Sequence, residues 1–145
     1  MAVKAYLELL KKQREEISNF PIAYAFDEKQ LQEALKKLGA KKEECVTIFG
    51  FGDIVKKQDA KSYVDMLERH TKEVLDLLVS DHEVAEEAFL CEMDNHEYAI
   101  NWSGDEDVLG CFGLTEESLT ELGLRQVYLN ARRRHMKHAQ EWDMI

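Results

Sequence analysis

The stretch from Asp59 to Val79 constrains this chain more than any other part of the sequence. Its apolar residues recur with the helical period of about 3.6 residues, and its charged residues fall on the opposite side. A helix of this length spans roughly 30 Å at about 1.5 Å per residue, which is the diameter of a small domain. We therefore expect other elements to pack on its apolar stripe, which is formed by Tyr63, Met66, Leu67, His70, Val74, Leu77 and Leu78.

The rest of the chain predicts more helices and a few short strands. Capping residues and helical periodicity predict helices at Ala2–Ser18, after Asp27, after a capping box of Ser80 with Glu83, after Thr115 and from Leu124 onward. Alternation and turn residues predict strands at Ile22–Phe26, in a glycine-linked hairpin over Val46–Lys56, and at Asn95–Trp102.

These elements predict an α+β fold, predominantly helical, with a small antiparallel sheet. With 145 residues, the chain is long enough for one domain over 1–145 with a core of its own. The three cysteines are far apart and odd in number, which is typical of reduced thiols in the cytoplasm. The first residues are typical of a helix and not of a signal peptide, and no apolar run reaches the length of a membrane span.

Negative charge is concentrated in the middle of the sequence. The formal net charge is -10. Between Asp65 and Asp107 there are 14 acidic residues against two basic ones, Arg69 and Lys72, a net charge of -12 for that segment. Such a segment repels phosphates and anionic lipids and attracts basic proteins, so we expect no direct contact with nucleic acid or a membrane.

We interpret the chain as a non-enzymatic, acidic protein-binding module with a basic protein partner and no cofactor. The expected partner-binding residues are Asp76, Glu83, Glu86 and Glu87. A solvated surface that only keeps the protein soluble is the plainer interpretation of the same charge, and a homodimer is an alternative that the sequence leaves open.

A metal-dependent enzyme is the alternative function. His70 lies on the apolar stripe of the central helix, and His135 and His138 lie on that of the last helix. If these helices cross, the three imidazoles would meet and, with a carboxylate such as Asp81 or Glu92, form a metal site. Half-buried histidines bonded to backbone or carboxylate groups explain the same pattern, and no cysteine is spaced to help bind a metal.

Four short motifs occur in order along the chain: Phe20–Phe26 followed by Gln30, Lys36–Gly39, Gly50–Gly52 and Asn95–Tyr98. Together they resemble a family of small uncharacterised bacterial and bacteriophage proteins. The resemblance implies a single-domain α+β protein without an assigned activity, often carried on mobile elements, and it offers no catalytic residue. We interpret the binding module accordingly as an inhibitor or accessory factor from a phage or mobile element. Phe51 departs from the small residues expected in the glycine-rich turn.

Overall fold

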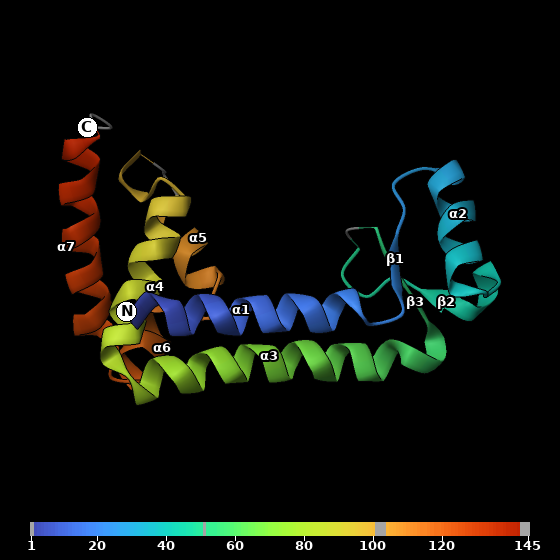
Figure 1. The fold of residues 1–145 in the computed structure, drawn as a ribbon, viewed down its shortest axis with the longest axis horizontal. Helices are drawn as coiled ribbons and strands as arrows, with labels where there is room; N and C mark the ends of the chain where they lie inside the picture. The colour runs from blue at the N-terminus through green and yellow to red at the C-terminus, as the bar shows by residue number, and fades with distance from the viewer. Residues whose placement is uncertain (1, 51, 101–103, 143–145) are drawn as a thin grey trace. The chain divides into compact units, whose positions relative to one another are not determined.

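The computed structural model describes residues 2–50, 52–100 and 104–142. Within these ranges the chain forms seven α-helices and a three-stranded antiparallel sheet (Figure 1), so the predicted helical α+β class is confirmed. The contacts group the chain into two compact units. One holds Lys11–His70, and the other holds the first ten residues together with the chain from Thr71 onward. The prediction of one domain over 1–145 stays a prediction.

The two long helices α1 (Ala2–Ser18) and α3 (Ala60–Ser80) each contribute residues to both units. Their bounds agree with the predicted helices. Buried residues of α3 include Tyr63, Met66, His70, Val74 and Leu78, which are members of the predicted apolar stripe.

The sheet belongs to the Lys11–His70 unit. Its strands are β1 (Ile22–Tyr24), β2 (Cys45–Val46) and β3 (Asp53–Lys56), in the order β1-β3-β2. Ile22 pairs with Val55, and Ala23 pairs with Ile54. Because neighbouring residues of a strand point to opposite faces, each pair belongs to a different face of the sheet. The strand and hairpin predicted from Ile22 and Val46 onward are therefore present, but shorter than expected.

Each face of the sheet has its own core. Ala23 and Ile54 pack with Ala34 and Leu38 of α2 (Glu28–Leu38), which lies beside β1 (Figure 1). On the opposite face, Ile22 and Val55 pack with residues of α1 and α3, including Ile17, Tyr63 and Met66. The small Ala23 side chain allows α2 to approach the sheet closely.

Short-range signals set the ends of α2. Asp27 accepts a hydrogen bond from the backbone N–H of Gln30 at 2.7 Å, as expected of an N-cap residue. Gly39 ends the helix with φ of 63°, a left-handed conformation that glycine adopts without strain. The 3-10 helix η1 (Lys42–Glu44) then leads into β2, and the 3-10 helix η2 (Lys57–Asp59) follows β3.

The other unit is formed mainly by α4 (His82–Asn95), α5 (Gly104–Gly110), α6 (Glu116–Glu121) and α7 (Arg125–Glu141). Helices α4 and α7 lie side by side (Figure 1). Their core contains Phe89, which is fully buried and contacts the rings of Phe112 and Tyr128 edge to face. Burial of a phenylalanine side chain contributes about 1.5–3 kcal/mol, so Phe89 adds to the stability of the unit.

Two local predictions need correction. Helix α4 is capped by Asp81, whose side chain accepts from the N–H groups of Glu83 and Val84, whereas Ser80 still belongs to α3. The expected strand at 95–102 is wrong over its described part. Asn95 ends α4, and Tyr98–Ile100 forms the 3-10 helix η3, while 101–102 lie outside the described residues. This segment is a 3-10 helix and not a strand because two contacts from outside it fix its conformation. Asp105 of α5 accepts the hydroxyl of Tyr98, and His135 of α7 accepts the backbone N–H of Ala99.

Candidate functional site

A groove with an acidic lining lies between the first turns of α4 and the start of α7. It has a volume of about 630 Å³. Glu83, Glu86 and Glu87 line it from α4, since residues three and four apart share one face of a helix. The opposite wall mixes polar and apolar residues and carries no lysine or arginine among the lining residues that the structure describes. The remaining lining residues are His82, Gly123, Gln126, Val127 and Asn130.

Arg134 pairs with two of the three glutamates of this groove. Its Nη1 atom lies 2.8 Å from Glu86 Oε2 and 2.6 Å from Glu87 Oε1. Hydrogen bonding to Glu87 and then to Glu86 raises the pKa of Arg134 above its ordinary value. One guanidinium therefore faces two carboxylates, and this group of three side chains keeps a net negative charge.

The structure places three of the four predicted partner-binding residues together. Glu83, Glu86 and Glu87 share the groove, whereas Asp76 lies on α3 and pairs with Lys72 at 2.7 Å. Asp76 is not among the residues that line the groove. A role for any of the four in partner binding stays a prediction.

His135 and His138 meet at one carboxylate. Asp94 Oδ1 lies 2.7 Å from Nδ1 of His135, and Asp94 Oδ2 lies 3.2 Å from Nδ1 of His138. The ring of His135 is fully buried, and its Nε2 atom accepts the backbone N–H of Ala99 at 3.0 Å. His135 therefore carries its proton on Nδ1 and donates it to Asp94. Both ring nitrogens of His135 are engaged within the protein.

His70, the third predicted metal ligand, belongs to the Lys11–His70 unit. Its Nε2 atom lies 3.5 Å from Glu16 Oε1, and its backbone carbonyl accepts a hydrogen bond from Gln13. The structure thus gives each of the three histidines a carboxylate neighbour. A metal site formed by His70, His135 and His138 stays a prediction.

A different set of metal-ligand side chains comes together at the end of α4. Glu92, His96 and Cys111 each offer a ligand atom, and these atoms lie within 4.8 Å of one another. The Sγ atom of Cys111 is 3.2 Å from Nε2 of His96. The same Nε2 atom is 3.6 Å from Oε2 of Glu92. Tyr6 donates a hydrogen bond to the other carboxylate oxygen, Glu92 Oε1, at 2.9 Å.

Sequence reasoning missed this cluster. Glu92 and His96 are four residues apart, so they lie on one side of the helix and its end, and this spacing was the available signal. Cys111 is 15 residues from His96 and comes from the turn after α5. The three cysteines are free thiols, and Cys111 belongs to this group of possible metal ligands, for which the sequence spacing gave no cysteine.

The contact between Cys111 and His96 does not resemble an activated nucleophile. Burial of the sulfur, and then the negative charge of Glu92, raise the pKa of Cys111 to about 11. The thiol is therefore protonated at neutral pH, whereas a nucleophilic cysteine needs a thiolate. In a catalytic pair, the carboxylate would contact the ring nitrogen that is remote from the thiol. Here Glu92 and Cys111 both face Nε2 of His96, so Glu92 does not orient the ring in this way. These side chains are better arranged to share a cation than to attack a substrate.

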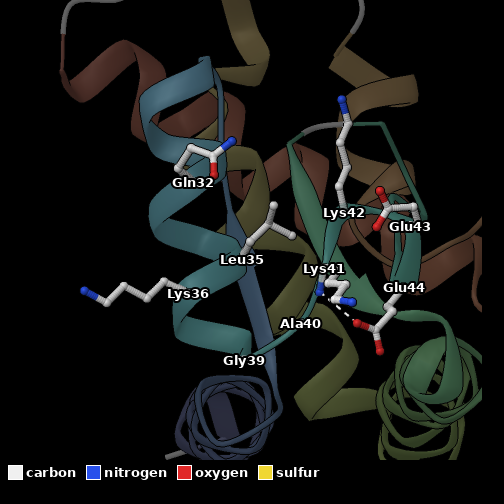
Figure 2. A pocket seen from close by; sticks show the side chains of 9 residues that line it. All are labelled: Gln32, Leu35, Lys36, Gly39, Ala40, Lys41, Lys42, Glu43 and Glu44. Carbon is white, nitrogen blue, oxygen red and sulfur yellow. Dashed lines mark hydrogen bonds between the residues drawn. The ribbon is translucent and has the colours of Figure 1, made fainter.

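A second pocket, of about 760 Å³, lies in the Lys11–His70 unit beside the C-terminal end of α2. Figure 2 shows Leu35 pointing toward the pocket and Lys36 pointing away from it. The side chain of Glu44 accepts the backbone N–H of Lys41 at 3.0 Å and so stabilises the turn of η1. A helix C-terminus disfavours anions, and acidic and basic residues are mixed along this wall. We therefore assign no ligand to this pocket.

Comparisons with known proteins identify a family but no activity. A model described as a family of unknown function (DUF7659) matches residues 5–134. No curated protein and no solved structure matches the chain. None of the described helices combines the length and the apolar character required to cross a membrane.

Proposed function

We propose that this chain, which belongs to the family of unknown function DUF7659, is a non-enzymatic module that binds a basic protein segment in the groove between α4 and α7. The observation that carries the proposal is the convergence of Glu83, Glu86 and Glu87 on one groove. A row of carboxylates in a concave surface, with Glu83 exposed and Glu86 and Glu87 partly exposed, is complementary to lysine or arginine side chains of a partner.

The charge of the acidic segment that contains α4 supports the same choice of partner. The acidic segment from Asp65 to Asp107 has a net charge of -12, and it includes all of α4. A field of this sign accelerates association with a basic protein and opposes contact with nucleic acid phosphates or anionic lipids. Binding should therefore weaken as salt screens the charges, because the Debye length falls from about 30 Å at 0.01 M to about 8 Å at 0.15 M.

The proposed setting is the cytoplasm of a bacterium. The four motifs that resemble phage and bacterial proteins support a role as an inhibitor or accessory factor from a phage or mobile element. A basic surface that normally holds nucleic acid is a suitable target, because an acidic groove competes for the same lysine and arginine side chains. A homodimer is compatible with this proposal, provided that the groove stays accessible.

The test compares charge variants of equal size. We would measure binding of the full chain to an arginine- and lysine-rich peptide, and capture of partners from a bacterial lysate, at low and at physiological salt. The variant E83Q/E86Q/E87Q should lose at least about tenfold in affinity at low salt, since mutation of surface charges mainly changes electrostatic attraction. The matched control is E28Q/E33Q/E43Q, which removes the same charge from the other compact unit.

Equal binding of the peptide by the two triple variants would contradict the proposal, because affinity would then depend on net charge alone. The capture experiment provides a second criterion. A protein retained equally by the wild-type chain and by E83Q/E86Q/E87Q would bind elsewhere, and the groove would have no role in its recognition.

A metal-dependent enzyme is the second candidate. The observation that favours metal chemistry is the group of Glu92, His96 and Cys111. Metal analysis of protein purified without chelator distinguishes this group from the three predicted histidines. A stoichiometric metal that is lost in His135→Ala and kept in Cys111→Ser would favour the histidine site.

A further inference from the structure

We propose that Glu92, His96 and Cys111 form a zinc-binding site between the C-terminal ends of α4 and α5. The proposal is independent of the acidic groove, because none of these three residues lines it. It rests on the ligand types, on the distances among their atoms and on the way the core holds them.

The ligand types select zinc among the common divalent ions. Thiolate and imidazole are ligands that zinc prefers, and a carboxylate oxygen is its third usual protein ligand. Magnesium and calcium prefer sites built from oxygen atoms alone, so a set with one sulfur and one nitrogen disfavours both. Zinc binding releases the thiol proton of Cys111, and the resulting thiolate and the carboxylate of Glu92 together neutralise the two positive charges of the ion.

Two of the three distances among the ligand atoms are close to those around a tetrahedral ion, and the third is within 4.8 Å. With zinc bonds of about 2.3 Å to sulfur and about 2.0–2.2 Å to nitrogen and oxygen, tetrahedral angles place sulfur about 3.6 Å from nitrogen, and nitrogen about 3.4 Å from oxygen. The observed separations are 3.2 Å between Cys111 Sγ and His96 Nε2, and 3.6 Å between His96 Nε2 and Glu92 Oε2. Small side-chain adjustments are therefore enough to coordinate one ion, without movement of the helices.

The surrounding structure holds these ligands in place. Glu92 precedes the fully buried Met93, and Cys111 precedes Phe112, which is 2% exposed. The backbone N–H of Cys111 is fixed by the carbonyl groups of Asp107 and Val108. Each ligand is thus next to a core residue or a helix end, so its backbone position is fixed before any ion binds.

Tyr6 supplies a supporting contact of the kind that metal sites commonly have. Its hydroxyl donates to Oε1 of Glu92, while Oε2 is the oxygen that faces His96. The tyrosine is 2% exposed and packs against the ring of Phe112. This bond orients the carboxylate and leaves one oxygen for the metal, so Tyr6 is a positioning residue. Three protein ligands leave a fourth tetrahedral position for a water molecule or an external ligand.

The experiment uses the full chain without a histidine tag. We would titrate the reduced protein with zinc alone in the presence of excess magnesium, and with cobalt(II) as a spectroscopic probe. We expect one zinc per chain and a sulfur-to-cobalt charge-transfer band. Cys111→Ser should abolish this band and weaken zinc binding by at least about a hundredfold, whereas Cys91→Ser, which removes a thiol from the same unit, should leave both unchanged.

Two further measurements distinguish variants that lose zinc binding because they misfold from variants that lose a zinc ligand. Zinc should raise the thermal midpoint of the wild-type chain and of Cys91→Ser, but not that of Cys111→Ser or His96→Ala. Tyr6→Phe should keep the cobalt band and weaken zinc binding about 10- to 100-fold, the usual effect of losing a supporting contact. Absence of stoichiometric binding in the wild-type chain, or an unchanged cobalt band in Cys111→Ser, would overturn the proposal.

Discussion

The backbone N–H of Ala99 donates a hydrogen bond to Nε2 of His135 across 3.0 Å. This contact connects η3 to α7, and it fixes the ring proton on the opposite nitrogen, which faces Asp94. The buried imidazole thus joins three segments of the chain through two hydrogen bonds. Its geometry explains why His135 is suited to a structural role in the core.

Removal of the carboxylate at position 94 should destabilise the protein. Asp94→Ala leaves the buried Nδ1–H of His135 without its acceptor, at an expected cost of about 1–3 kcal/mol in the free energy of unfolding. Asp94→Asn keeps an oxygen acceptor and should cost less. Urea unfolding followed by circular dichroism measures both. Equal stability of the wild-type chain and Asp94→Ala would show that the contact with His135 contributes nothing.

A side chain at position 52 should be poorly tolerated. Gly52 has φ of 83°, and a Cβ atom there would lie 2.8 Å from the carbonyl oxygen of Ala25 and 2.7 Å from the ring of Phe26. We expect Gly52→Ala to lower the free energy of unfolding by about 1–3 kcal/mol, because the conformation is strained for alanine and the contact is with backbone. Gly110→Ala is the control, since no atom lies within 4 Å of its Cβ. Thermal melts that show the same loss for both variants would contradict the prediction.

Alkaline pH should destabilise the folded state in part through Tyr128. Burial, followed by the hydrogen bond to Asp105, raises the pKa of Tyr128 far above its ordinary value of 10.0. Above pH 10 the unfolded chain loses this proton while the folded chain keeps it, so stability falls as pH rises. Above pH 10, the phenol of Tyr128 should lower the free energy of unfolding by about 1.4 kcal/mol for each pH unit.

Tyr128→Phe tests that contribution, because it removes the titrating group and keeps the ring. The variant should show a shallower loss of unfolding free energy above pH 10 than the wild-type chain. Tyr24→Phe is the control, since Tyr24 is 54% exposed. If the free energy of unfolding falls equally with pH in the wild-type chain and in Tyr128→Phe, then Tyr128 has the same pKa in the folded and unfolded states, and the prediction is wrong.

Loss of Arg134 should strengthen binding of a basic peptide at the groove. Arg134→Gln frees the carboxylates of Glu86 and Glu87 and should raise affinity for a lysine-rich peptide severalfold at low salt. The cost in stability should be below about 1 kcal/mol, because the side chain of Arg134 is 40% exposed. Arg133→Gln removes the same charge from an exposed position and is the control. Isothermal titration would contradict the prediction if both variants gained affinity equally.

Much of the local structure was predictable because it depends on neighbours in the sequence. Asp27, Gly39 and Thr115 mark helix ends through contacts within four residues of themselves, and the structure confirms each. The alternation of Ile22 and Ala23 predicted two unlike faces of a strand, and the two separate cores on the sheet confirm it. The cap of α4 was misassigned because Ser80 and Asp81 are adjacent residues that both favour this position.

The sequence by itself determined the helical α+β class, the central helix and the acidic character of α4, since periodicity and charge are properties of the residues in order. Only the tertiary structure decided which distant groups meet. Packing brought Cys111 to His96, His135 to Ala99, and Arg134 to Glu86 and Glu87. The same packing made Tyr98–Ile100 a 3-10 helix where alternation favoured a strand. Contacts between residues 15 to 48 positions apart depend on how whole helices pack, and no local pattern records that packing.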